Sequence, residues 1–234
     1  MLERIDYMES GTRLAGWFAA PAGDAAAPGI LVAHEAPGVG RHVKAVAERL
    51  AAEGYCALAL DLYGGEDFTI GEARELHRQM MEVPGLMVRR AMAGLETLRA
   101  RPRVDARRLA AMGFCQGGIT ALELARAGAP IRAAIGFHPG LKRPVGSPDG
   151  PIAAKVLMMV GDADPVVPAE DRLAFARDMD AAGADWQLHL YGGVGHSFTN
   201  SEVDALGFPG FRYDAQASRR SWNAMTALLR EVFQ

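Results

Sequence analysis

The chain has 234 residues, of which half are apolar and 23% are charged, and this is enough to bury one sizeable core. Its 25 basic and 28 acidic residues are mixed along the sequence and leave a net charge of −3, which argues against partners such as nucleic acid or an anionic membrane. The first residues carry charges where a signal peptide would be apolar, and no run of about 18 apolar residues occurs, so we expect a cytoplasmic protein.

Strand-like and helical segments alternate along the chain, which predicts an α/β fold with a mostly parallel, doubly wound sheet and helices on both faces. We expect one domain over residues 1–234, without a large cap domain. An antiparallel hairpin opens the chain, and a small-residue loop over 21–28 leads to the first central strand. The expected strands cover residues 5–8, 14–20, 29–34, 57–61, 108–112, 133–137, 155–160 and 186–191; the expected helices cover 42–53, 70–100 with a break near Pro84, 119–125, 170–181 and 214–233.

Residues 113–117 read Gly-Phe-Cys-Gln-Gly, the Gly-x-nucleophile-x-Gly spacing of a sharp strand-to-helix turn. A side chain on Gly113 or Gly117 would collide with the neighbouring strand or helix. Cys115 is therefore predicted to be a nucleophile, although a small buried cysteine beside a tight turn is the alternative. The other cysteine, Cys56, lies in an apolar run and is predicted to belong to the core of a strand.

Other chemistry-bearing residues also follow predicted strands, where ligands bind in a doubly wound sheet. Asp162 and Asp164 follow one strand, and His196 follows the next. A nucleophile, an acid and a histidine in this chain order are typical of a catalytic triad on such a sheet. The backbone N–H groups of Gln116 and Ala36, in the loops after the nucleophile strand and the first central strand, are the expected oxyanion donors.

Together these motifs resemble the dienelactone hydrolase family of α/β-hydrolases over nearly the whole chain. The motifs that carry the resemblance are Glu35, residues 113–118, Asp164 with residues 165–168, and residues 195–198. The resemblance implies an α/β-hydrolase fold and cofactor-free hydrolysis of an ester or lactone through a thioester acyl-enzyme. It places the triad on Cys115, His196 and Asp164, and it implies that Glu35 helps to activate the cysteine. In the family the acid precedes a short hydrophobic segment ending in Val-Pro, which selects Asp164 and leaves Asp162 as a turn or capping residue.

Four further residues near strand ends are predicted to line the substrate pocket: Tyr63, His138, Phe198 and Asn200. Dienelactone-degrading members of the family follow the histidine motif with an arginine that grips the substrate carboxylate, where this chain has Asn200. An asparagine brings no charge, so a neutral ester becomes at least as good a candidate as dienelactone, unless Arg74 or Arg78 compensates.

The remaining histidines are predicted to have structural roles and no part in catalysis. His34, and His138 as the alternative to a pocket role, are read as hydrogen-bonded structural histidines. His42, His77 and His189 are read as surface or packing positions. No second ligand stands at a spacing typical of zinc, so no metal site is predicted.

The function predicted from the sequence is hydrolysis of a small-molecule ester or lactone without a cofactor. The first alternative is a catalytically silent small-molecule binding protein of the same fold, although a binder has no need of a complete nucleophile, acid and base. A thiol peptidase would share the Cys-His pair but fits this turn motif poorly.

Overall fold

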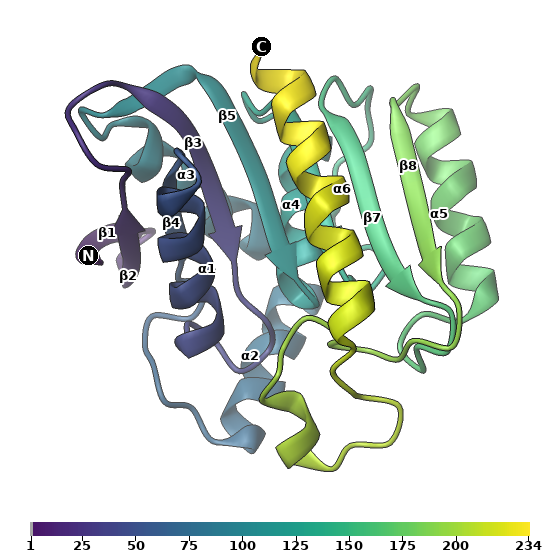
Figure 1. Ribbon diagram of the computed structural model, residues 1–234. Helices are drawn as coiled ribbons and strands as arrows, with labels where there is room; N and C mark the ends of the chain where they lie inside the picture. Colours follow the sequence, from purple (N-terminus) through teal and green to yellow (C-terminus); the bar gives the residue numbers. More distant parts are fainter. Residues whose placement is uncertain (1) are drawn as a thin grey trace.

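A sheet of eight strands, in the order β1-β2-β4-β3-β5-β6-β7-β8, lies between two layers of helices in the computed structural model, which describes residues 2–234 (Figure 1). β1 and β2 form an antiparallel hairpin, and β2 pairs antiparallel with β4. The other six strands, β3 to β8, all run parallel to one another. This confirms the predicted mostly parallel, doubly wound sheet. The strands are β1 (Glu3–Glu9), β2 (Thr12–Ala19), β3 (Ala27–Ala33), β4 (Cys56–Leu60), β5 (Val104–Phe114), β6 (Ala133–Phe137), β7 (Lys155–Gly161) and β8 (Trp186–Tyr191).

The helices cover both faces of the sheet. Side chains of α1 and α6 pack in one apolar cluster, and side chains of α3, α4 and α5 pack in another on the opposite face. Within the described residues, none of the helices is long and apolar enough to cross a membrane. The helices are α1 (Arg41–Ala52), α2 (Ile70–Glu82), α3 (Leu86–Arg99), α4 (Gln116–Arg126), α5 (Ala169–Ala181), α6 (Ala215–Phe233) and a 3-10 turn, η1 (Val203–Leu206).

The central strands are apolar on both faces because helices cover both. In β3, Ile30 and Val32 belong to the cluster with α1 and α6, while Leu31 and Ala33 belong to the opposite cluster. All four are at most 2% exposed. Burial of each larger aliphatic side chain contributes about 1.5–3 kcal/mol, so an uninterrupted apolar run is what a parallel strand at the centre of such a sheet needs.

Several element ends differ from the expectation. β3 begins at Ala27, inside the predicted loop, because Ala27 and Pro28 pair with Val104 and Asp105 before an irregularity in register. β5 therefore starts at Val104 instead of at residue 108. Proline and charged side chains at these outer strand ends conceal the pairing in the sequence pattern. The 3-10 turn at Val203–Leu206 was also not predicted.

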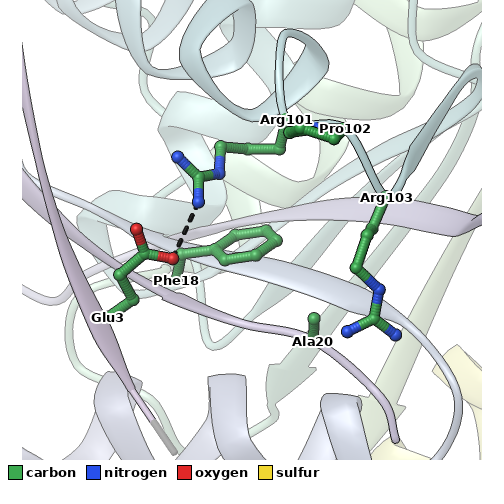
Figure 2. Close-up of a pocket in the computed structure, with 6 residues that line it drawn as sticks. All are labelled: Glu3, Phe18, Ala20, Arg101, Pro102 and Arg103. Atoms are coloured by element: carbon green, nitrogen blue, oxygen red, sulfur yellow. Dashed lines mark hydrogen bonds and ion pairs between the residues drawn. The ribbon is translucent and has the colours of Figure 1, made fainter. Parts of the chain in front are cut away.

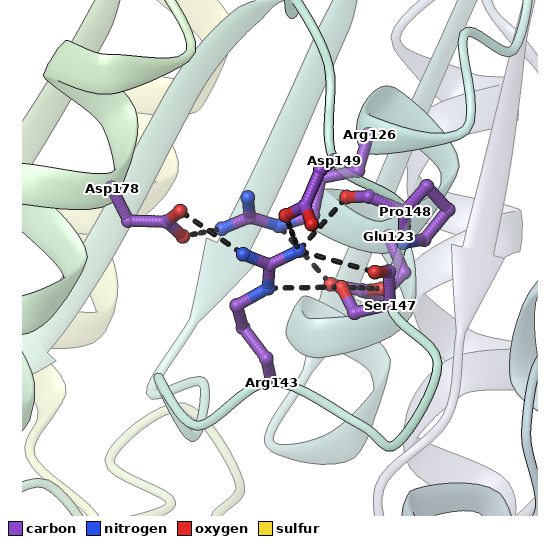
Figure 3. Close-up of polar contacts among 7 residues, drawn as sticks. All are labelled: Glu123, Arg126, Arg143, Ser147, Pro148, Asp149 and Asp178. Carbon is purple, nitrogen blue, oxygen red and sulfur yellow. Dashed lines mark hydrogen bonds and ion pairs between the residues drawn. The ribbon is translucent and has the colours of Figure 1, made fainter.

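A buried polar network joins α4, α5 and the loop after β6 (Figure 3). Glu123 is 1% exposed, and its Oε1 lies 3.1 Å from Nε of Arg126, whose side chain is 4% exposed. Arg126 also pairs with Asp178 of α5, and Ser147 of the loop donates to Glu123. Arg143 extends the network to Asp178 at 3.3 Å. The network anchors the helix that follows Cys115 to its neighbours.

Candidate active site

Cys115 lies on the sharp turn between β5 and α4, and its backbone is held in an unusual conformation. Its φ is 51° and its ψ is −114°, a region that non-glycine residues enter only when the surrounding structure imposes it. The two flanking glycines permit the turn. A Cβ on Gly113 would lie 2.3 Å from the carbonyl oxygen of Gly117, and a Cβ on Gly117 would lie 2.1 Å from that of Ala33 in β3. The predicted collisions with helix and strand are thereby confirmed, and Cys115 remains partly exposed.

His196 and Asp164 form a buried pair beyond the ends of β8 and β7. Nδ1 of His196 lies 2.7 Å from Oδ2 of Asp164, and neither side chain is exposed to solvent. The other carboxylate oxygen of Asp164 accepts the backbone N–H of Val166 at 2.8 Å. Asp162 is instead an exposed residue paired with Arg172 at 2.8 Å. The structure therefore joins the histidine to Asp164 and not to Asp162.

The charge of His196 depends on its neighbours. Burial by itself disfavours the imidazolium, but Cys115 and Asp164 outweigh it and raise the pKa of His196 to about 10. Because Asp164 occupies Nδ1, Nε2 is the free ring nitrogen; it is buried and has no hydrogen-bond partner among residues 2–234. Burial, the largest cause, together with the nearby His196 and His42 lowers the pKa of His138 well below its usual value. A neutral histidine therefore packs against His196, with ring centroids 5.2 Å apart.

Removal of the Cys115 sulfur is expected to lower the pKa of His196, because Cys115 is one of the two residues that raise it. Histidine NMR titration of the wild type and Cys115→Ala measures the shift directly. The wild-type resonance should titrate well above neutrality, and the variant should titrate at lower pH. An unchanged titration would mean that sulfur and imidazole do not interact.

Glu35 follows β3 and is held by two residues from other parts of the chain. Its Oε2 accepts from Nδ2 of Asn200 at 3.0 Å and lies 3.3 Å from Nδ1 of His42. The side chain is 12% exposed, and Oε1 is buried without a hydrogen-bond partner among residues 2–234. Asn200, predicted to line the pocket, thus contacts the carboxylate predicted to activate Cys115.

Gln116, directly after Cys115, is the centre of a second polar cluster. Its side-chain oxygen accepts the hydroxyl of Tyr63 at 2.9 Å and lies 2.6 Å from Nδ1 of His77. Gln116 is fully buried, and its backbone N–H belongs to the first turn of α4, where N–H groups have no partner within the helix. Ala36, the other predicted oxyanion donor, lies in the loop directly after β3 and Glu35.

The other predicted pocket residues are buried beside the histidine. His138 is fully buried, and its Nε2 lies 2.7 Å from the hydroxyl of Thr199. Phe198 is also fully buried, with its ring centroid 5.2 Å from that of His138. His138 therefore packs against both His196 and Phe198 and contacts the loop that carries them. His34 is a structural histidine, since Nε2 accepts the Leu62 N–H at 3.2 Å and Nδ1 donates to the Glu35 carbonyl at 2.6 Å.

His42 is a packing residue as predicted, since its ring centroid lies 4.5 Å from that of Phe114. Sequence analysis did not predict that His42 and His77 each also make a polar contact with a residue of the candidate site. His42 contacts Glu35, and His77 contacts Gln116. A signal for His77 was present, because it stands at helical spacing from Ala73 and Met80, the two buried residues of α2. The sequence offered no comparable signal for His42, the second residue of α1, whose contact depends on how the loop between β3 and α1 turns back toward Glu35.

A separate cavity of about 370 Å³ lies at the amino-terminal end of β5, the opposite edge of the sheet from Cys115 (Figure 2). Arg101 pairs there with Glu3 at 2.7 Å and lies over the ring of Phe18. The six lining residues are Glu3, Phe18, Ala20, Arg101, Pro102 and Arg103. None of them is a nucleophile, so the candidate active site is the cluster around Cys115.

Comparison with known proteins identifies the family of this chain. The family model of the dienelactone hydrolase family matches residues 14–233. The chain belongs to the dienelactone hydrolase family. Its fold is accordingly an α/β-hydrolase fold, and membership implies hydrolase activity on esters or lactones.

Two of three similar proteins cover almost the full length of this dienelactone hydrolase family member. A crystal structure of a dienelactone hydrolase-like promiscuous phosphotriesterase from metagenomic libraries is 38% identical, with a TM-score of 0.93 over 99% of this chain and 98% of that one. A Bradyrhizobium protein named "Probable 2-oxo-3-(5-oxofuran-2-ylidene)propanoate lactonase" is 28% identical over 97% of this chain and 94% of its own length. An uncharacterised Caenorhabditis elegans protein is 36% identical over 64% of this chain and 96% of its own length.

Proposed function

We propose that the protein is a carboxylic-ester or lactone hydrolase that works without a cofactor through a thioester acyl-enzyme on Cys115. The observation that carries the proposal is the contact of 2.7 Å between Nδ1 of His196 and Asp164, beyond the same edge of the sheet as Cys115. A carboxylate, an imidazole and a partly exposed sulfur on a strained turn are the parts that nucleophilic acyl transfer requires.

In the first half-reaction the thiolate of Cys115 attacks the carbonyl carbon and forms a C–S bond, while the carbonyl electrons move to oxygen. The backbone N–H groups of Gln116 and Ala36 stabilise this oxyanion. When the C–O bond to the alcohol breaks, the imidazolium of His196 gives its proton to the leaving oxygen. The products of this step are the thioester and the free alcohol.

In the second half-reaction neutral His196 takes a proton from water through Nε2, and the oxygen attacks the thioester carbonyl. The C–S bond breaks, the carboxylic acid leaves, and Cys115 returns as the thiolate beside the imidazolium. Asp164 keeps the imidazole in the required tautomer throughout. Glu35 assists in forming the thiolate, and Asn200 and His42 determine where its carboxylate rests.

The charges around the site favour an uncharged substrate. Asn200 brings no charge and donates to Glu35. Arg74 and Arg78 lie on the exposed face of α2, and Arg78 is paired with Glu75 at 2.6 Å and with Glu82. A substrate carboxylate would therefore meet Glu35 without a bidentate arginine partner, and a neutral ester or lactone is the better fit.

The test is to trap the acyl-enzyme. The wild type is mixed with p-nitrophenyl butyrate and quenched in acid, and we expect intact mass spectrometry to show the addition of one butyryl group, which peptide mapping places on Cys115. Cys115→Ala should show no adduct. A panel of p-nitrophenyl acetate, both dienelactone isomers and paraoxon then ranks substrates; paraoxon is included because the metagenomic relative is named a phosphotriesterase. Release of nitrophenol without an adduct would contradict the thioester, and binding without turnover would favour the silent binding protein.

A further inference from the structure

Helix α2 lies beyond the carboxyl ends of the central strands, on the side of the site (Figure 1). It turns two different faces to its surroundings. Ala73 and Met80 are its buried residues, and the half-buried His77 lies on the same face. Arg74 and Arg78 are exposed on the other face. Among the described residues of α2, His77 is therefore the only titratable side chain that is not exposed to solvent.

His77 acts on the residue next to the nucleophile. Its Nδ1 is 2.6 Å from Oε1 of Gln116, and because an amide oxygen can only accept, this nitrogen carries the proton. Tyr63 donates to the same oxygen at 2.9 Å from the loop after β4. Two donors from separate elements thus converge on one oxygen of a fully buried side chain.

The amide of Gln116 is held by its oxygen. Its Nε2 is buried without a hydrogen-bond partner among residues 2–234, so the contacts with His77 and Tyr63 are what orient it. The backbone N–H of the same residue stands directly after Cys115 in the first turn of α4. Because the held side chain and this N–H belong to one buried residue, the side-chain contacts limit how far the N–H can move.

We propose that His77 is a positioning residue of the reaction, whose hydrogen bond to Gln116 fixes the backbone N–H that stabilises the oxyanion; this assignment rests on the proposed function of Cys115. Oxyanion donors accelerate a reaction because they are aimed before charge develops, and a small misplacement removes much of the benefit. The oxyanion exists only in and near the transition state. Loss of the positioning contact should therefore lower kcat and leave KM nearly unchanged.

The test compares His77→Asn with His77→Leu. The two side chains have similar size, but only asparagine keeps a donor near the position of Nδ1. With p-nitrophenyl butyrate, kcat of the leucine variant should fall about tenfold, the worth of about one hydrogen bond, while that of the asparagine variant stays within about threefold of wild type. Arg74→Ala, on the exposed face of the same helix, is the control and should leave both constants unchanged.

Two further measurements separate positioning from other effects. The rate of Cys115 alkylation by iodoacetamide should be equal in the asparagine and leucine variants, which shows that fold and nucleophile are intact. Cys115→Ala is assayed in parallel: if it keeps wild-type turnover, the proposed function itself is overturned. If Cys115→Ala is inactive but the two His77 variants have the same kcat, or differ in KM alone, the assignment of His77 is overturned.

Discussion

Turnover of p-nitrophenyl butyrate by Cys115→Ala is expected to fall on the order of 10⁴-fold or more, because alanine removes the atom that forms the acyl-enzyme. The fall should appear in kcat, since the alanine variant keeps the proposed oxyanion donors, the N–H groups of Gln116 and Ala36, and can still bind the ester. Triad members act as a unit, so adding His196→Ala to Cys115→Ala should cost little more. Steady-state kinetics at equal protein concentration measures each variant.

Cys56→Ala is the matched control for this prediction. Cys56 is the only other cysteine, it is fully buried, and it lies at the amino end of β4, at the opposite edge of the sheet from the site. Its Sγ donates to the backbone carbonyl of Arg103 at 3.4 Å, far from His196. Wild-type kcat is expected for Cys56→Ala. Comparable turnover by Cys115→Ala and the wild type would overturn the mechanism.

Arg126→Leu is expected to destabilise the fold by about 3–5 kcal/mol, because it removes the cation from the buried pair with Glu123 and leaves that carboxylate uncompensated. Burial raises the pKa of the Glu123 carboxyl, so its charge depends on Arg126 as the nearest cation, 3.1 Å away. For a chain of this size the loss corresponds to a fall in Tm of about 10 °C. Urea unfolding followed by circular dichroism and calorimetry measures both quantities.

The double variant Glu123→Leu/Arg126→Leu tests the reason for that loss. It removes the stranded carboxylate together with the cation, while Asp178 keeps Arg143 as its partner at 3.3 Å. Replacement of a buried pair by apolar side chains is often nearly neutral, so the double variant should be more stable than Arg126→Leu alone. Equal or greater destabilisation of the double variant would show that lost packing, and not uncompensated charge, explains the effect.

The fold and the chain order of the three proposed catalytic residues could be predicted from local patterns. A continuous apolar run between two helical segments indicates a strand of a parallel sheet, because helices cover both faces of such a strand. Cys115, Asp164 and His196 each follow such a strand, and parallel strands end at the same edge of the sheet. Even the requirement for Gly113 and Gly117 is local, since the turn itself brings helix and strand into contact.

The sequence pattern alone does not decide whether Asp162 or Asp164 is the partner of His196; the family resemblance was needed for that choice. Asp162 and Asp164 both follow β7, two residues apart. Only the path of the loops after β7 and β8 brings one of them, Asp164, to 2.7 Å from the imidazole and turns the other toward Arg172. The same holds for Arg74 and Arg78, since the orientation of α2 directs both of them to solvent.

By itself, the sequence determined the sheet, the strand ends that carry Cys115, Asp164 and His196, and the kinship with dienelactone hydrolases, because these depend on residues close together in the chain or on the order of strands. Only the tertiary structure decided that His42 and Asn200 meet at Glu35, and that Tyr63 and His77 meet at Gln116. Those contacts join residues 39 to 165 positions apart, or pair a loop residue with a nearby helix. Whether such residues meet in space depends on how whole helices, strands and loops pack together, which no periodicity in the chain encodes.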